Sequence, residues 1–179
     1  MISEMIKIGK VVYSRGYVVS TGGNLSYYVR KKNYIIIKKS GKCLGNLCPE
    51  DFVSVKLGES HPEASMDLHI HAAIYANSAY NATLHAHPPY AIALSYKYSK
   101  LKPIDFETKI KLKDVPILAV RHDDLPAKIV ECLAKGYTCV IERGHGVYVW
   151  GFSLLECLHK LELIEHAAKL IFLSENSGY

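Results

Sequence analysis

Two β-rich runs near the start of the sequence are joined by a connection of only three residues. The runs cover residues 25–30 (LSYYVR) and 34–38 (YIIIK), and the polar turn between them is Lys31-Lys32-Asn33. Parallel strands need a crossover of a dozen or more residues, so a connection this short indicates an antiparallel hairpin. A third run at 52–57 follows, and the first third of the chain is therefore predicted to be an antiparallel meander.

The rest of the sequence alternates between helical and strand-like patterns. Apolar residues recur at helical spacing in five segments, which are residues 2–14, 66–76, 90–98, 124–135 and 154–171. Strand-like runs after the meander cover residues 82–87, 115–120, 137–141 and 147–150. The chain contains no linker and no internal repeat, so we expect one domain spanning residues 1–179.

Composition excludes several classes of protein. No stretch reaches the roughly 18 to 20 apolar residues that span a bilayer, and the amino end lacks a charged head before an apolar run. We therefore expect a cytoplasmic, unprocessed protein without a membrane partner. The net charge is +5, but the most basic run, residues 30–32, lies at the expected hairpin tip, so no nucleic-acid partner is expected. The five cysteines form no Cys-x-x-Cys pair, which argues against disulfides and a cysteine zinc site.

Three of the nine histidines are placed to share a metal ion. His85 and His87 are separated by one residue on a predicted strand, so both side chains emerge on the same face. His145 lies between Gly144 and Gly146 in a turn, where small neighbours let an imidazole approach a buried site. Three neutral imidazoles with an open fourth position are typical of catalytic zinc.

Other histidine groups are weaker candidates. His69 and His71 are also separated by one residue, but they fall in a helical pattern, where positions two apart do not share a face. His159, Glu162 and His166 do share a face of the last helix, where solvent or a neighbouring subunit is the ordinary explanation. An isolated His-x-His pair can equally be two surface histidines, so the metal prediction depends on a third histidine joining the first pair.

A glycine-rich turn and a serine–glycine pair are candidates for an anion site. Gly22 and Gly23 leave successive backbone N–H groups able to curl around an anion, and Asn24 adds a side-chain donor. Ser40 and Gly41 repeat this arrangement. A lone Gly-Gly-Asn is more often an ordinary turn, so the assignment depends on the whole constellation. The lysines that could neutralise a phosphate here are Lys38, Lys39 and Lys42, although strand alternation would direct some of them to solvent.

Taken in order, five motifs resemble the class II aldolase/adducin family. They are Thr21-Gly22-Gly23-Asn24-Leu25-Ser26, Ser40-Gly41, Asp67 four residues before His71, His85-Ala86-His87 and Gly144-His145-Gly146. The match spans nearly the whole chain and is most similar to the short, archaeal-type L-fuculose-1-phosphate aldolases. The resemblance implies a three-layer α/β/α fold around a largely antiparallel sheet, and a homotetramer with active sites between subunits.

The resemblance also implies roles for individual residues. His85, His87 and His145 would bind Zn²⁺ or another divalent transition metal, and Asp67 stands in the place of the family's catalytic glutamate. The alternative for Asp67 is an ordinary helix cap. The implied contacts to the substrate phosphate are Gly23, Asn24, Ser40, Gly41 and Ser65.

The implied activity is the reversible cleavage of a small phosphorylated sugar, a ketose 1-phosphate such as fuculose 1-phosphate, to dihydroxyacetone phosphate and a short aldehyde. A zinc ion held by three imidazoles can polarise the ketose carbonyl and take up the charge of an enediolate. Asp67 would ligate the zinc in the empty enzyme and, once displaced, move a proton at the carbon that becomes nucleophilic.

Three features depart from the aldolase pattern. Asp67 replaces the usual glutamate and resembles the sugar-phosphate 4-epimerases, while Met66 stands where a second phosphate-binding serine is common. Longer relatives supply catalytic tyrosines from a neighbouring subunit, yet residues 100–136 contain none, which leaves Glu107 or Tyr179 as substitutes. The alternatives are therefore a 4-epimerase using retro-aldol and aldol steps, a dehydratase of a methylthio-ketose phosphate, or an adducin-like interaction domain without metal. Intact histidines count against the last.

Overall fold

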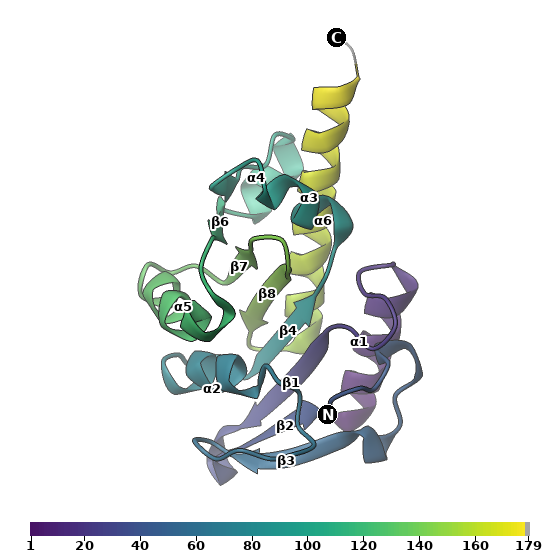
Figure 1. Cartoon of the computed structure of the whole chain (residues 1–179), viewed down its shortest axis with the longest axis vertical. Helices are drawn as coiled ribbons and strands as arrows, with labels where there is room; N and C mark the ends of the chain where they lie inside the picture. The colour runs from purple at the N-terminus through teal and green to yellow at the C-terminus, as the bar shows by residue number, and fades with distance from the viewer. Residues whose placement is uncertain (178–179) are drawn as a thin grey trace.

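The computed structural model describes residues 1–177, which form one mixed sheet of eight strands with helices on both faces (Figure 1). The strands are β1 (Asn24–Val29), β2 (Tyr34–Lys38), β3 (Phe52–Lys56), β4 (Ala82–Ala86), β5 (Lys100–Leu101), β6 (Val115–Leu118), β7 (Cys139–Glu142) and β8 (Gly146–Gly151). The α-helices are α1 (Ile2–Ser14), α2 (Leu68–Ala76), α3 (Pro89–Ser95), α4 (Phe106–Lys111), α5 (Leu125–Ala134) and α6 (Leu154–Asn176).

The sheet is largely antiparallel, as the family resemblance implies. Its strand order is β3-β2-β1-β4-β8-β7-β6-β5, and within residues 1–177 only the β6–β7 pair is parallel. Strands β1, β2 and β3 pair in succession and confirm the meander predicted from the short first connection. In the same described residues, no helix is both long and apolar enough to cross a membrane.

Two apolar cores, one on each face of the sheet, give the fold its three layers. Along β8, Val147 and Val149 join the core beneath α1, α3 and α6, whereas Tyr148 and Trp150 join the core beneath α2 and α5. This alternation follows from the period of two along a strand, which sends successive side chains to opposite faces. The three-layer α/β/α arrangement implied by the family resemblance is confirmed (Figure 1).

Some elements differ from the sequence-based expectation. Strand β5 has only two residues, too few to show a periodic pattern. Helix α4 has only six residues, and its apolar residues Phe106 and Ile110 are exposed. The cap of α4 is the side chain of Asp105, which accepts a hydrogen bond from the Thr108 N–H at 2.9 Å. Helix α2 begins at Leu68 rather than at residue 66, because the backbone of Asp67 has the non-helical conformation of an N-cap.

The centre of the sheet brings distant parts of the sequence together. Strand β4 lies between β1 and β8, and in this register His85 is directly opposite Asn24 on one side and Tyr148 on the other. The hairpin between β7 and β8 places Glu142 opposite Gly146. These strand ends therefore form the frame of one site.

Candidate functional site

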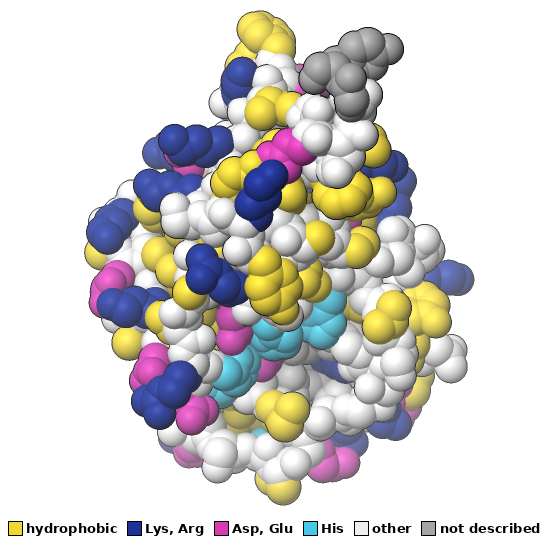
Figure 2. All heavy atoms as spheres, turned by 45° about the horizontal axis from the view of Figure 1, so that its top comes forward, with side chains coloured by type: hydrophobic (Ala, Val, Ile, Leu, Met, Phe, Trp, Pro, Cys, Tyr) yellow, Lys and Arg dark blue, Asp and Glu magenta, His cyan; other side chains and the backbone are white. Residues whose placement is uncertain are grey.

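A cavity of about 560 Å³ contains both predicted groups of site residues. Figure 2 shows several histidine side chains gathered at a hollow on one face of the molecule. The predicted metal and catalytic residues that line the cavity are His85, His87, His145 and Asp67. The predicted anion-site residues that line it are Gly22, Gly23, Asn24, Ser40, Gly41 and Ser65. The two groups belong to separate sequence motifs, and the fold brings them into one pocket.

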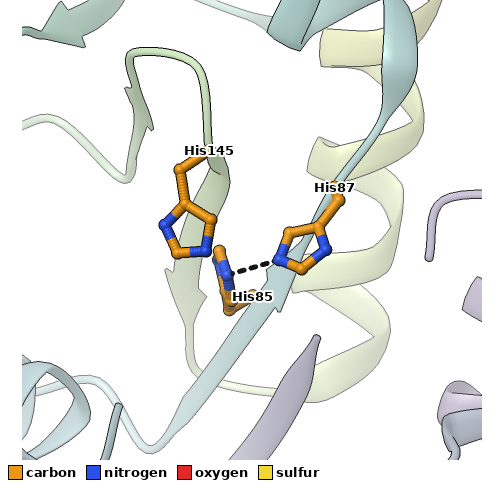
Figure 3. A group of neighbouring side chains, drawn as sticks. All are labelled: His85, His87 and His145. Atoms are coloured by element: carbon orange, nitrogen blue, oxygen red, sulfur yellow. Dashed lines mark hydrogen bonds between the residues drawn. The ribbon is translucent and has the colours of Figure 1, made fainter. Parts of the chain in front are cut away.

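The three predicted imidazoles lie together (Figure 3). The ring centroids are 4.8 Å apart for His85 and His87, 4.8 Å for His85 and His145, and 5.1 Å for His87 and His145. The Nε2 atoms of His85 and His87 face each other at 3.0 Å. Two rings come from the end of β4 and one from the β7–β8 turn, so residues about sixty positions apart in sequence meet at one point.

Glycine at position 146 makes this close approach possible. A Cβ atom there would lie 2.5 Å from the carbonyl oxygen of Ala86, 2.8 Å from Cδ2 of His87 and 2.9 Å from Cε1 of His85. Gly144 has a φ of +73°, the left-handed region that favours glycine, and it closes the turn. Both glycines that flank His145 therefore have a specific steric role.

The donor set fits a metal ion such as zinc. Two nitrogens bound tetrahedrally to one zinc ion are roughly 3.3 Å apart, close to the 3.0 Å between the facing Nε2 atoms. The Nδ1 of His85 lies 3.1 Å from the carbonyl oxygen of Val147, and the Nδ1 of His145 lies 2.5 Å from the Glu142 carboxylate. Such outer contacts fix the tautomer and leave the other nitrogen free for a metal. Burial lowers the pKa of His85 well below its usual value and also lowers that of His87, which favours neutral ligands.

Asp67 lies beside these rings, and its side chain does not cap α2. It occupies the N-cap position, but its carboxylate makes no capping hydrogen bond. Its Oδ2 accepts hydrogen bonds from Asn24 Nδ2 at 2.7 Å and from the Tyr148 hydroxyl at 3.2 Å. The same oxygen lies 3.7 Å from His85 Nε2, and Oδ1 lies 3.3 Å from His122 Nε2. Burial acts to raise the pKa of Asp67, but His85, the Asn24 hydrogen bond and neighbouring histidines outweigh it and hold the pKa at about 2.

Three further residues at the site are not indicated by any sequence motif, namely His122, Glu142 and Tyr148. Tyr148 stacks on His85 across the β4–β8 ladder, with ring centroids 3.9 Å apart. Glu142 ends β7, and His122 begins the short 3₁₀ turn before α5. Glu142 and Tyr148 stand three residues before and after His145, a spacing that becomes informative only once the β7–β8 pairing is known.

The glycine-rich turn packs against β4 next to His85. Gly23 has a φ of +70°, and a Cβ atom there would lie 2.6 Å from Val18 Cγ1 and 2.8 Å from the carbonyl oxygen of His85. One expectation needs correction, because the N–H of Gly22 already donates to the carbonyl oxygen of Val19 at 3.0 Å. The predicted pair of free N–H groups is therefore reduced to that of Gly23.

Lys38 is the one of the three candidate lysines that lines the cavity. Lys39 forms a salt bridge with Glu63 at 3.1 Å, and Lys42 forms one with Asp51 at 2.9 Å. Lys38 is 2% exposed and lines the cavity, where its Nζ donates to two backbone carbonyl oxygens. Burial lowers the pKa of Lys38 to about 8.

Several weaker candidates lie apart from the cavity lining. His69 is exposed and His71 is buried, with its Nδ1 2.6 Å from Ser26 Oγ, so this pair does not share a face. Glu107 forms an ion pair with Lys111 along α4. Tyr179 lies outside the described residues. The exposed members of the α6 group are His159 and His166, while Glu162 pairs with Arg15.

Comparisons with known proteins agree with the motifs. The family model for the Class II Aldolase and Adducin N-terminal domain matches residues 3–172. An L-fuculose phosphate aldolase of Methanococcus maripaludis is 31% identical over 181 residues, covering 98% of each chain. A 3-oxo-tetronate 4-phosphate decarboxylase of Escherichia coli K12 is 30% identical over 181 residues, covering 95% of this chain and 85% of its own length. The crystal structure of L-fuculose-1-phosphate aldolase from Thermus thermophilus superposes with a TM-score of 0.91 at 29% identity, covering 99% of this chain and 96% of the other. With its motifs, its fold and its relatives in agreement, the chain belongs to the class II aldolase and adducin family.

Proposed function

We propose that this chain is a zinc-dependent aldolase that reversibly cleaves a ketose 1-phosphate of the fuculose 1-phosphate type. The products are dihydroxyacetone phosphate and a short aldehyde. The observation that supports this best is a single cavity lined by three clustered imidazoles and by a glycine–serine anion site. The relative named L-fuculose phosphate aldolase, 31% identical, supports the same substrate class.

In this proposal, His85, His87 and His145 hold the zinc or another divalent transition metal. The bound ion supplies a Lewis acid that polarises the substrate carbonyl and takes up the negative charge that develops as the carbon–carbon bond breaks. His85, His87 and His145 would supply three protein ligands, the number that is characteristic of catalytic zinc sites. The histidine rings fix where that carbonyl lies relative to the rest of the cavity.

Asp67 is the proposed carrier of the proton. Its carboxylate lies 3.7 Å from His85 Nε2 and is held by Asn24 and Tyr148, so it is oriented beside the proposed ligands. In the condensation direction, Asp67 takes a proton from the hydroxymethyl carbon of dihydroxyacetone phosphate, and in the cleavage direction it returns that proton. A low pKa keeps the carboxylate ionised in the free enzyme.

The phosphate is proposed to bind at the glycine- and serine-rich side of the cavity. Lys38 supplies a positive charge, since among residues 1–177 its ammonium contacts only backbone carbonyl oxygens and has no carboxylate partner. A charge-assisted hydrogen bond from this group would stabilise a bound dianion. The proposed contacts with the phosphate oxygens are Gly23, Asn24, Ser40, Gly41 and Ser65.

We also propose a homotetramer in the cytoplasm, with residues 1–179 acting as one domain and with active sites between subunits. Support comes from large apolar side chains that are exposed on α4 and α6. They are Phe106, Ile110, Phe172 and Leu173. Helices α4 and α6 contact each other, so a second copy of the chain that docks on both helices would cover these exposed apolar side chains.

A second candidate is a decarboxylase of a 3-oxo acid phosphate. Relatives named 3-oxo-tetronate 4-phosphate decarboxylase are 30% and 32% identical to this chain. Loss of carbon dioxide from a 3-oxo acid leaves negative charge beside a carbonyl, as retro-aldol cleavage does, so one site can stabilise both. A 4-epimerase is a further alternative, because Asp67 resembles the aspartate of the sugar-phosphate 4-epimerases. Epimerisation uses the same cleavage, followed by recombination of the two fragments.

One panel of substrates tests these proposals. Zinc-replete protein is incubated with dihydroxyacetone phosphate and a series of aldehydes, with pentulose phosphates, and with 3-oxo-tetronate 4-phosphate, and products are identified by mass and stereochemistry. We expect condensation of dihydroxyacetone phosphate with a short aldehyde. Carbon dioxide release without condensation would support the decarboxylase, and epimerised pentulose phosphate would support the epimerase. Full activity in both His87→Ala and Asp67→Asn would show that the assigned roles are wrong.

A further inference from the structure

Glu142 is a buried carboxylate whose contacts are with histidines. It is 5% exposed, its Oε2 lies 2.5 Å from His145 Nδ1, and its Oε1 lies 3.1 Å from His122 Nδ1. Within residues 1–177 it forms no salt bridge with a lysine or an arginine, and the neighbouring Arg143 instead donates to the carbonyl oxygen of Ser95. Burying a carboxylate is costly unless partners stabilise it, so these histidine contacts account for its position.

The β7–β8 hairpin brings Glu142 and His145 side by side. Glu142 pairs with Gly146 across the ladder, and the His145 N–H donates to the Glu142 carbonyl oxygen at 3.1 Å. The turn is also fixed from outside, because the Gly144 N–H donates to Ser95 Oγ on α3 at 2.9 Å. The carboxylate and the imidazole are thus held together by a turn that is hydrogen-bonded both internally and to a neighbouring helix.

The distances favour an orienting contact over a second metal ion. Nitrogen and oxygen donors of His122, Glu142 and His145 do lie within 4.8 Å of one another. Two ligand atoms of one transition-metal ion, however, are roughly 3 Å or more apart, whereas the Glu142 oxygen and the His145 nitrogen are 2.5 Å apart. That separation is typical of a charge-assisted hydrogen bond.

We propose that Glu142 is a positioning residue for the metal centre, which accepts a hydrogen bond from His145 Nδ1 and thereby directs Nε2 of the same ring at the cation. The proposal rests on the metal site of the proposed function. A carboxylate in this place fixes both the tautomer and the orientation of a ligand imidazole and raises its basicity. Removing such a partner typically weakens metal binding by about 10-fold to 100-fold.

His122 contacts the same carboxylate but is not one of the proposed metal ligands. Its Nδ1 lies 3.1 Å from Oε1 of Glu142 and 3.3 Å from Oε2, the oxygen that faces His145, and its Nε2 lies 3.3 Å from Asp67 Oδ1. His122 therefore connects Glu142 with Asp67, the proposed proton carrier, whereas His145 connects Glu142 with the proposed metal ion. The contact of Oε2 with His145, at 2.5 Å, is shorter than its contact with His122, at 3.3 Å, so removing the imidazole of His122 should leave the orientation of His145 intact.

The test measures metal binding rather than turnover. Zinc affinity is determined by competition with a chromophoric chelator for the wild type, Glu142→Gln, His122→Asn and Glu156→Gln. Glu156 is a matched control, because it is a partly buried glutamate that accepts from the Phe152 N–H at 2.8 Å beyond the far end of β8. We expect zinc affinity to fall about 10-fold to 100-fold in Glu142→Gln and to stay within about threefold in the other two. The visible spectrum of the Co²⁺ form should change in Glu142→Gln alone.

The outcomes separate this inference from the proposed function. If the wild type binds neither zinc nor Co²⁺, both are wrong. If the wild type binds zinc and Glu142→Gln has the same affinity and Co²⁺ spectrum, the positioning role is wrong while the aldolase proposal stands. If Glu142→Gln does not fold, the same two measurements are made on Glu142→Ala, and wild-type affinity with a wild-type Co²⁺ spectrum would again contradict the role.

Discussion

The ring of Tyr148 lies flat against the ring of His85, with centroids 3.9 Å apart and planes inclined by 14°. The two residues are directly opposite each other in the β4–β8 ladder. From the same position the Tyr148 hydroxyl donates to Asp67 Oδ2 at 3.2 Å. One fully buried tyrosine therefore contacts both a proposed metal ligand and the proposed proton carrier.

Tyr148→Phe keeps this stacking and removes only the hydroxyl. Because a hydrogen bond to a charged group contributes roughly 1.5 to 3 kcal/mol, we expect kcat to fall by about tenfold or more while zinc affinity changes by less than about threefold. Steady-state kinetics and chelator competition measure the two effects. Tyr28→Phe, which removes a hydrogen bond to Asn33 at the hairpin of β1 and β2, is the matched control. Unchanged kcat in Tyr148→Phe would show that the hydroxyl does not support Asp67 in turnover.

Asp67→Asn should separate proton transfer from metal binding. A positioned acid–base group typically contributes about 10²-fold to 10⁴-fold to the rate, so kcat should fall by that factor while zinc remains bound. Nuclear magnetic resonance can follow the exchange of the hydroxymethyl protons of dihydroxyacetone phosphate with deuterium oxide when no aldehyde is present. We expect this exchange to be lost with turnover. Exchange at the wild-type rate in Asp67→Asn would place the proton transfer on another residue.

The pH dependence of kcat/KM should follow the protonation of Lys38. Burial lowers its pKa to about 8 from an ordinary 10.5, with Cys43, Asp51 and Asp67 acting in the opposite direction. If the ammonium binds the substrate phosphate, kcat/KM should fall as the pH rises through about 8, because the free enzyme then loses this proton. Lys38→Arg should move that limb to higher pH, since a guanidinium stays protonated. A limb at the same pH in Lys38→Arg would assign it to another group.

Between about pH 8 and 10.5, Lys38 should make the free energy of unfolding rise with pH, whereas kcat/KM should fall. Because the folded pKa is lower than the unfolded pKa, the unfolded state binds more protons between about pH 8 and 10.5. The contribution of Lys38 to the free energy of unfolding therefore increases with pH in that window. Thermal unfolding measured alongside the kinetics can thus show that lost activity above pH 8 is not lost folding.

Gly146→Ala tests the close packing of the histidines. The added Cβ would lie within 3 Å of atoms of Ala86, His87 and His85, so these groups must move apart. We expect a loss of about 1 to 3 kcal/mol in stability from overpacking and at least tenfold weaker zinc binding. Gly136→Ala is the contrast, because its φ is +77° and nothing lies within 4 Å, so it adds backbone strain alone. Equal zinc affinity in both variants would contradict the steric argument.

The sequence predicts well those features that depend on neighbours along the chain. A three-residue connection is enough to make the first strands antiparallel. His85 and His87 share a face because a strand has a period of two, and the structure places their Nε2 atoms 3.0 Å apart. The order of the family motifs also predicts His145 as a ligand, although no rule about neighbouring residues would place it beside His85 and His87.

The sequence cannot indicate residues whose role depends on strand pairing. Tyr148 reaches the site because β8 pairs with β4, and Glu142 does so because the β7–β8 turn places its side chain beside His145. His122 comes from a polar 3₁₀ turn without a periodic pattern. The hydrogen bond of the Gly22 N–H to Val19 likewise depends on a local turn geometry that a Gly-Gly pair alone does not define.

The proposed metal centre is tested most directly by anomalous diffraction from crystals grown with zinc. Difference maps calculated at wavelengths on either side of the zinc absorption edge locate the ion independently of any assumed ligand. We expect one strong peak per chain, roughly 2.1 Å from a ring nitrogen of each of His85, His87 and His145. A zinc peak held elsewhere, for example at the exposed histidines of α6, with none between these three rings, would contradict the proposed site.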